Sequence, residues 1–99
     1  TLDKAKTVIG TPYYLSPEII MNKPYSFKSD IWALGVLLYE MTMLKVPFDA
    51  KGHHVLYFKV LKGEYNKVSD NFSKELQDLI KVLLTVDQKL RPDINEILS

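Results

Sequence analysis

The polar segment at the start of the chain carries two threonines whose hydroxyls could take part in phosphate chemistry. Thr7 and Thr11 lie four residues apart, and Thr11 stands between Gly10 and Pro12 in a stretch typical of a turn. A phosphate on a threonine adds about −1.5 to −2 charges and can pair with arginine to order a loop. From these residues alone, the plainer interpretation is a turn threonine at 11 and a solvated one at 7.

Two acids and one arginine are the next candidates. Glu18 follows Ser16-Pro17, and Arg91 comes late in the chain. On their own they read most simply as exposed charges at separate helix ends. Asp30 precedes a long apolar run, where a carboxylate requires hydrogen-bond donors. Favourable interaction with the dipole at a helix N-terminus is the plainer role for Asp30, and the two roles are compatible.

The histidines do not form a metal site. His53 and His54 are adjacent, so on a helix their side chains point in different directions. The sequence has no cysteine and no cluster of carboxylates near them. We therefore expect no metal ligand set.

One stretch must position the others. Ser29 to Leu44 is predicted to be a single helix whose polar members, Asp30, Glu40 and Thr42, fall on three separate parts of its circumference. A helix that is apolar all round is either a membrane span or the buried centre of a larger helical body. The uninterrupted apolar run, Ile31 to Tyr39, has nine residues, whereas a span needs roughly 20. The pattern predicts a buried central helix that other segments cover.

Capping residues and apolar periodicity predict four further helices. No stretch alternates as a strand does, so the predicted fold is all-α. The expected helices are Pro17 to about Met21 after the cap Ser16, Gly52 to Lys62 before Gly63, an amphipathic helix after Ser73 that carries Leu76, Leu79, Ile80, Leu83 and Leu84, and a last helix after an Asp93/Glu96 capping box.

Composition narrows the class of protein. The chain has 99 residues, a net charge of +1 and 25% charged residues, as in ordinary globular domains, without the basic patch of a nucleic-acid binder. The absence of cysteine suits an intracellular protein, cytoplasmic or nuclear. The first residues are polar, so no signal peptide is visible, and no membrane partner is expected. Because no initiator methionine is present, we expect a piece of a longer chain.

Four motifs, in this order and spacing, resemble the second half of the C-terminal lobe of a eukaryotic protein kinase. They are Gly10-Thr11-Pro12-Tyr13-Tyr14, Ser16-Pro17-Glu18 in place of the family's Ala-Pro-Glu, Asp30-x-Trp32-x-x-Gly35, and Arg91. The resemblance covers essentially the whole chain. The stretches AKTVIGTPYYLSPEII and RPDINEIL are most similar to the NIMA-related serine/threonine kinases.

The resemblance implies one partial kinase domain over residues 1–99, with an activation and substrate loop at 1–15 and a helical subdomain at 16–99. Gly10, Thr11, Pro12 and Tyr13 would receive the substrate next to the phosphorylated residue. Thr11 would also support the catalytic aspartate, which this chain does not contain, and its presence favours Ser/Thr substrates. Thr7 would be the activating phosphothreonine, modified by an upstream kinase or by the kinase itself.

The remaining motif residues would be structural. Glu18 and Arg91 would form a buried ion pair, and Asp30 would accept hydrogen bonds from the backbone of the catalytic loop. Trp32 would belong to the core. Gly35 costs about 1 kcal/mol in a helix relative to alanine, which suggests close helix packing at that position.

The resemblance implies a part of a serine/threonine kinase that transfers the γ-phosphate of ATP to proteins. Phosphoryl transfer also needs a glycine-rich loop, a lysine, a catalytic aspartate and Mg²⁺ ligands, and the sequence has none of those motifs. The parent kinase would use ATP and Mg²⁺, whereas this stretch would bind neither and would be inactive alone. The alternatives are a non-catalytic pseudokinase and a helical protein-interaction module, and an all-α unit unrelated to kinases is a distant third.

The central helix also leads to an expectation about association. In a full lobe, the catalytic loop and an earlier helix would cover part of it. Without them an apolar surface of a few hundred Å² would be exposed, roughly enough to invite association. The stretch is therefore expected to self-associate.

Overall fold

The computed structural model describes residues 12–99, and all regular secondary structure within them is helical. The elements are a 3₁₀ helix η1 (Pro12–Tyr14) and the α-helices α2 (Pro17–Ile20), α3 (Phe27–Met43), α4 (His53–Lys62), α5 (Lys74–Leu83) and α6 (Ile94–Leu98). The all-α prediction is confirmed. No helix in the described part of the chain is long and apolar enough to cross a membrane.

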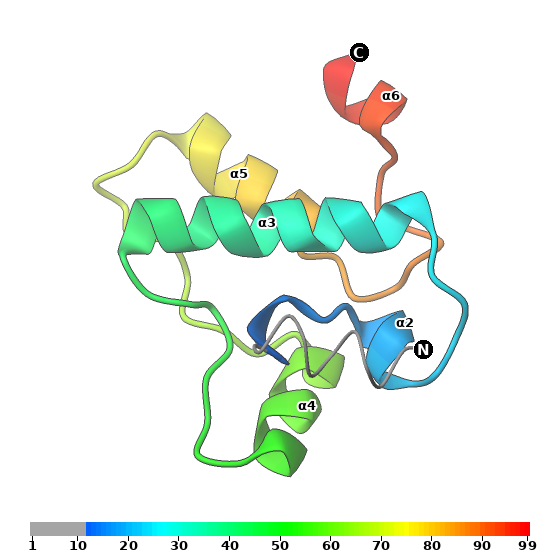
Figure 1. Ribbon diagram of the computed structural model, residues 1–99. Helices are drawn as coiled ribbons and strands as arrows, with labels where there is room; N and C mark the ends of the chain where they lie inside the picture. The colour runs from blue at the N-terminus through cyan, green and yellow to red at the C-terminus, as the bar shows by residue number, and fades with distance from the viewer. Residues whose placement is uncertain (1–11) are drawn as a thin grey trace.

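Helix α3 is the axis of the molecule (Figure 1). Helix α5 packs along it, η1 contacts it from another side, and α2 lies against α4. Helix α6 projects from the body and contains no buried residue. The short 3₁₀ helix therefore lies directly against the central helix.

Helix α3 begins two residues earlier than predicted, at Phe27. Ser26 is its N-cap: the Ser26 hydroxyl accepts from the Lys28 amide at 3.1 Å, and the Ser29 hydroxyl accepts from the Ser26 amide. Ser29, where the predicted helix begins, is thus the third helical residue. At the other end Leu44 adopts a left-handed conformation, with φ at 62°, and stops the helix.

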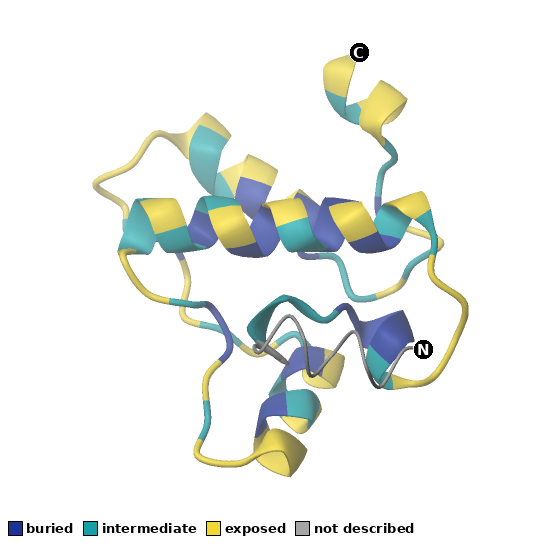
Figure 2. Cartoon of the chain, viewed as in Figure 1, coloured by how far each residue is buried: buried dark blue, intermediate teal, exposed yellow. Residues whose placement is uncertain are grey.

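Only part of the circumference of α3 is covered. Figure 2 shows buried and exposed residues alternating along it. Trp32, Val36 and Tyr39 are buried, but Leu34, Leu37 and Met41, which follow a helical spacing, are 42%, 45% and 68% exposed. The sequence led us to expect an apolar surface on this helix, and these three residues supply it. We call them the α3 stripe.

The core lies on the covered side of α3. Trp32 stacks on Phe48 with ring centroids 5.6 Å apart, and the edge of Tyr65 meets both Tyr39 and Phe48. Apolar residues of α4 and α5, and the residue that ends α5, complete this cluster: Leu56, Val60, Ile80 and Leu84. The core thus fixes α3, α4 and α5 to one another.

The helix ends follow the predicted capping residues. The hydroxyl of Ser73 accepts from the Leu76 amide at 3.1 Å, and the Asp93/Glu96 capping box forms in both directions. Gly63 takes the left-handed conformation that ends α4, with φ at 69°. The predicted and observed helices differ by one or two residues at their ends, where frayed turns are assigned differently.

Candidate functional site

The motif residues that the structure describes lie around η1 and the first half of α3. Thr7, Gly10 and Thr11, the candidates for phosphorylation, substrate docking and support of catalysis, lie outside the described residues. Pro12 opens η1, and Tyr13 follows it, partly buried and packed against the core. The described half of the predicted docking segment is therefore helical and rests on the body of the protein.

Glu18 and Arg91 meet in a buried, two-pronged ion pair. Nη1 of Arg91 donates to Oε2 of Glu18 at 2.8 Å, and Nη2 donates to Oε1 at 3.0 Å. The two side chains are 0% (Arg91) and 2% (Glu18) exposed. Ser29 also donates to Oε2 of Glu18, at 2.8 Å. Parallel hydrogen bonds between a guanidinium and a carboxylate are among the stronger polar contacts in proteins.

The guanidinium of Arg91 uses its remaining donors on backbone carbonyls. It reaches Thr85 at 2.8 Å, Lys28 at 2.7 Å and Val86 at 3.1 Å. Its centre also lies 5.1 Å from the ring of Trp32. A buried arginine needs partners for its five N–H groups, and here one side chain ties α2, the start of α3 and the loop after α5 together.

The environment of Glu18 keeps it ionised. Burial by itself would raise the pKa of this carboxyl, but the hydrogen bonds from Arg91 and Ser29 outweigh it, so the pKa lies below its ordinary value of 4.5. The pair is therefore charged at neutral pH. A charged pair at this depth depends on both partners, because either one alone would be a buried, unpaired ion.

A second anchor holds η1 to the last turn of α3. The hydroxyl of Tyr14 donates to Oε1 of Glu40 in a partly buried contact. This hydrogen bond and burial raise the pKa of Tyr14. From the sequence, Glu40 was predicted only as a polar member of an apolar helix, and Tyr14 only as the last residue of the Gly10-Thr11-Pro12-Tyr13-Tyr14 motif. A carboxylate within an apolar helix requires a hydrogen-bond donor. Glu40 itself was therefore the sequence feature that could have indicated such a contact.

Asp30 is exposed at the start of α3, where it accepts a hydrogen bond from the hydroxyl of Tyr25. That bond raises the pKa of Tyr25. The tyrosine is a partner that the sequence analysis did not foresee. Because Asp30 faces solvent, its carboxylate is accessible to a further donor.

Trp32 and Gly35 lie at the contact between α3 and its neighbours. Trp32 is fully buried, and its indole N–H has no hydrogen-bond partner among the described residues. A β-carbon at Gly35 would lie 2.8 Å from Cβ of Leu83 and 2.9 Å from Cδ2 of Leu84. This position thus sets how closely α3 and α5 approach.

The described residues contain no group of three histidine, aspartate or glutamate side chains able to hold a metal ion. His53 instead stacks on Tyr57, with ring centroids 5.7 Å apart.

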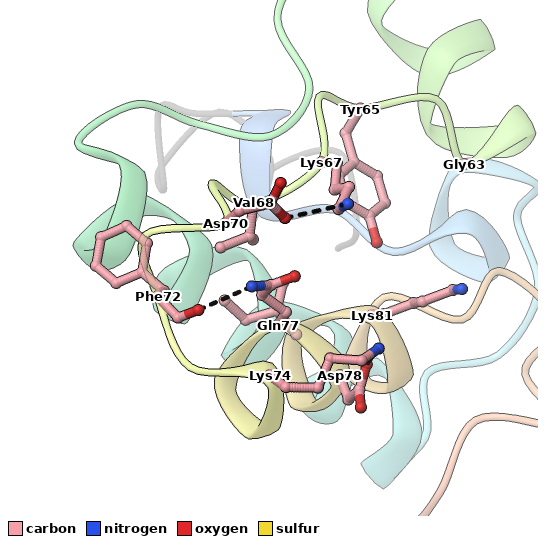
Figure 3. A pocket seen from close by; sticks show the side chains of 11 residues that line it. Gly63, Tyr65, Lys67, Val68, Asp70, Phe72, Lys74, Gln77, Asp78 and Lys81 are labelled. Carbon is pink, nitrogen blue, oxygen red and sulfur yellow. Dashed lines mark hydrogen bonds and ion pairs between the residues drawn. The ribbon is translucent and has the colours of Figure 1, made fainter.

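One hollow lies apart from these residues. It has a volume of about 750 Å³ and lies between the α4–α5 connection and α5 (Figure 3). None of the motif residues lines it. The motif residues that the structure describes instead fix one short segment, η1 and the turn into α2, against the helices.

Comparison with known proteins gives consistent matches. The family model described as "Protein kinase domain" matches residues 1–99. The chain is 52% identical over 96 residues to "Probable serine/threonine-protein kinase nek3" of Dictyostelium discoideum, a match that covers 96% of the chain and 8% of that protein. It is 48% identical over 99 residues to human "Serine/threonine-protein kinase Nek5", covering 100% of the chain and 14% of that protein.

A mouse protein, "Serine/threonine-protein kinase Nek1", is also 48% identical over 99 residues, and the match covers 8% of its length. The chain therefore spans between 8% and 14% of the length of these three relatives. The similarity is to one continuous stretch of much longer proteins.

Proposed function

Since this chain belongs to the protein kinase domain family and has NIMA-related serine/threonine kinases among its relatives, we propose that it is the substrate-docking half of the C-terminal lobe of an active serine/threonine kinase. The whole kinase would transfer the γ-phosphate of ATP to serine or threonine in protein substrates. Such a kinase would act inside the cell, in the cytoplasm or nucleus.

The observation that carries the proposal is the double anchoring of the segment from η1 to α2. Tyr14 is bonded to Glu40 of α3, and Glu18 is bonded to Arg91 and Ser29. Catalysis by positioning depends on holding a substrate within a fraction of an ångström of the reactive geometry. A segment fixed at both ends on a rigid core provides such a base.

The docking role would fall to Gly10 and Thr11, which precede this anchored region, and to Pro12 and Tyr13, which begin it. Thr11 would also orient the catalytic aspartate, a residue supplied by other parts of a kinase domain. Asp30 would hold the catalytic loop through its exposed carboxylate. These roles follow from matching motifs, and each is open to substitution experiments.

The sequence has none of the kinase motifs that bind ATP and Mg²⁺, and the described residues contain no group of three or more His, Cys, Asp or Glu side chains that could hold a metal ion. ATP and Mg²⁺ would be held elsewhere in a kinase domain, by its glycine-rich loop, its lysine and its metal-binding acids. When bound they supply the phosphoryl group and neutralise its developing charge. This chain would position the protein substrate.

Thr7 would be the regulatory site, phosphorylated by an upstream kinase or by the kinase itself. A phosphate there adds about −1.5 to −2 charges and can order a loop by pairing with arginine. Mass spectrometry of the active protein checks this assignment. Recovery of a fully active protein that carries no phosphate at Thr7 contradicts it.

The proposal is tested by phosphoryl transfer in the full-length protein with Thr11→Ala and Thr11→Ser. If Thr11 orients the base through its hydroxyl, alanine lowers kcat on a serine peptide by about 10² or more, whereas serine retains most of it. Melting temperatures of both variants serve as the control for folding. A wild-type protein that binds ATP but transfers no phosphate would indicate a pseudokinase instead.

A further inference from the structure

Two adjacent hollows lie beside α5, on the side that faces the α4–α5 connection. The larger, of about 750 Å³, is the one in Figure 3, and the smaller has a volume of about 420 Å³. Both are lined in part by Gly63, Tyr65 and Lys81. We call the two together the α5 groove. Two hollows that share lining residues could receive neighbouring side chains of one extended peptide.

The apolar part of the α5 groove is pre-formed. Val68 and Ile80 line it and are buried, at 4% and 0% exposure. Tyr65 forms a wall, and the edge-on contacts of its ring with Tyr39 and Phe48 fix its position. Phe72, at the far end in Figure 3, is 37% exposed, and Gln77 donates to its carbonyl at 2.8 Å. An apolar side chain could therefore insert without reorganisation of the groove.

The charges of the α5 groove are unevenly distributed. At the Phe72 end, Lys67 pairs with Asp70 at 3.3 Å and Lys74 pairs with Asp78 at 3.1 Å, so that end is close to neutral. No acidic residue lines the smaller hollow, which is flanked by Lys62 and Lys81.

Within residues 12–99, the two lysines of the smaller hollow form no ion pair. Neither Lys62 nor Lys81 forms one among the described residues, and Lys62 lies 4.8 Å from the ring centre of Phe58. One end of the α5 groove is thus apolar and neutral, whereas the other is cationic.

We propose that the α5 groove docks an extended acidic segment of a partner protein. The carboxylates of that segment would meet Lys62 and Lys81, and an apolar or aromatic side chain would fill the hollow between Tyr65 and Phe72. Buried aromatic anchors supply most of the affinity of such contacts, while charge complementarity sets orientation and association rate. The groove shares no residue with the docking segment of the proposed kinase function, so the proposal stands or falls independently of it.

The test is fluorescence anisotropy on the full-length protein with a fluorescein-labelled peptide in which a phenylalanine precedes a run of glutamates. Lys62→Glu with Lys81→Glu should raise Kd by about tenfold or more, and added salt should weaken the wild-type complex. Lys23→Glu with Lys51→Glu makes the same change in net charge on exposed lysines outside the groove. This control should leave Kd within about twofold.

A second variant tests the apolar end of the α5 groove. Phe72→Ala should raise Kd by about tenfold, as truncation of an aromatic contact does in peptide complexes. Circular dichroism melts identify any variant that fails to fold, and Phe72 is exposed enough for its truncation to be tolerated.

Several outcomes overturn the proposal. They are an unchanged Kd in the groove variant, an equal loss in the control variant, and the absence of binding up to about 1 mM, the weak limit of useful affinities. Equal affinity for a lysine peptide also contradicts it, because the charge of the groove would then be irrelevant. Stronger binding to phosphatidylserine vesicles or to RNA would assign the basic end to another class of partner.

Discussion

Arg91 shows how much of this structure depends on one side chain. It is fully buried, and its donors are distributed over Glu18 and three backbone carbonyls. A lysine at this position would keep the charge but lose the planar fork that allows two parallel bonds to a carboxylate. The pair therefore depends on the identity of the arginine as well as on its charge.

Glu18→Ala should lower the free energy of unfolding by about 3–5 kcal/mol, because it leaves the charge of Arg91 buried and unpaired. Chemical denaturation measures this change. The matched control is Lys67→Ala, which breaks an ion pair whose side chains are 75% and 84% exposed. An exposed pair contributes about 0–1 kcal/mol. Equal losses in the two variants would contradict the structural role assigned to Glu18.

The pKa of Glu18 predicts how stability depends on pH. Because this pKa is lowered in the folded protein below 4.5, the contribution of Glu18 is fully present above pH 4.5 and is lost as the pH falls through the folded-state pKa. Wild-type stability should therefore decrease on acidification more steeply than that of Glu18→Gln. Parallel acid limbs in denaturation curves of the two proteins would contradict this.

Tyr14→Phe removes the hydroxyl that joins η1 to α3 and keeps the ring. If this bond positions the docking segment, kcat/KM for a protein substrate falls by about tenfold, while stability changes by only about 1 kcal/mol, the usual net value of a hydrogen bond. The exposed Tyr25→Phe removes a comparable bond, to Asp30, at the start of α3. A Tyr14→Phe protein with wild-type kcat/KM would contradict the positioning role.

Of three side-chain contacts at the site, only one was predicted from the sequence. The approach of Glu18 to Arg91 came from the resemblance to kinases, since their types alone favoured two exposed charges. The Tyr14–Glu40 and Tyr25–Asp30 bonds were not predicted. Both depend on where a loop meets a helix in three dimensions, and neither periodicity nor capping rules encode that position.

At the scale of elements, Gly35 decides the distance between α3 and α5. Alanine would be favoured by about 1 kcal/mol as a helix former. Its β-carbon would, however, lie 2.8 Å from Cβ of Leu83 and 2.9 Å from Leu84. The clash involves an atom next to the backbone of α5, which cannot move without moving the helix.

Gly35→Ala should therefore destabilise the protein by about 1–3 kcal/mol, the range of overpacked cores. Thermal and chemical unfolding measure the change. The control is Gly52→Ala, since a β-carbon there meets nothing within 4 Å. Gly52 is an N-cap, so its loss should be about 0.5–1 kcal/mol. A stabilised Gly35→Ala would show that helix propensity outweighs the contact.

Helix positions were predicted well because their signals are local. Ser16, Ser73, Asp93 and Gly63 are caps or stops that act within one turn. The start of α3 was predicted two residues too late, at Ser29, since both Ser26 and Ser29 are suitable caps. The structure uses both in one capping box, which moves the first helical residue to Phe27.

In the molecule as a whole, the α3 stripe is an exposed apolar surface on the central helix. Its three residues are large, apolar and between 42% and 68% exposed. Apolar spacing in the sequence predicted that this face needs a cover, but it could not say which segment provides it. The α5 groove was not predicted at all, because it arises where a connection folds back over a helix.

The α3 stripe predicts that the stretch comprising residues 1–99 self-associates when isolated. Sedimentation velocity should show oligomers, and Leu37→Glu with Met41→Lys should shift the population toward monomer without a change in net charge. Lys23→Glu with Asp49→Lys, at exposed sites away from the stripe, is the charge-matched control. A monomeric wild-type stretch with a cooperative melt would contradict the prediction.

We propose that this chain positions serine or threonine substrates in an active kinase. The most direct measurement is phosphate transfer from ATP by the full-length protein to two peptides that differ only in serine or tyrosine at the acceptor position. We expect kcat/KM for the serine peptide to be at least about a hundredfold higher than for the tyrosine peptide. This ratio corresponds to a difference of about 2.7 kcal/mol in activation free energy. Equal transfer to both, or ATP binding without transfer to either, would contradict it.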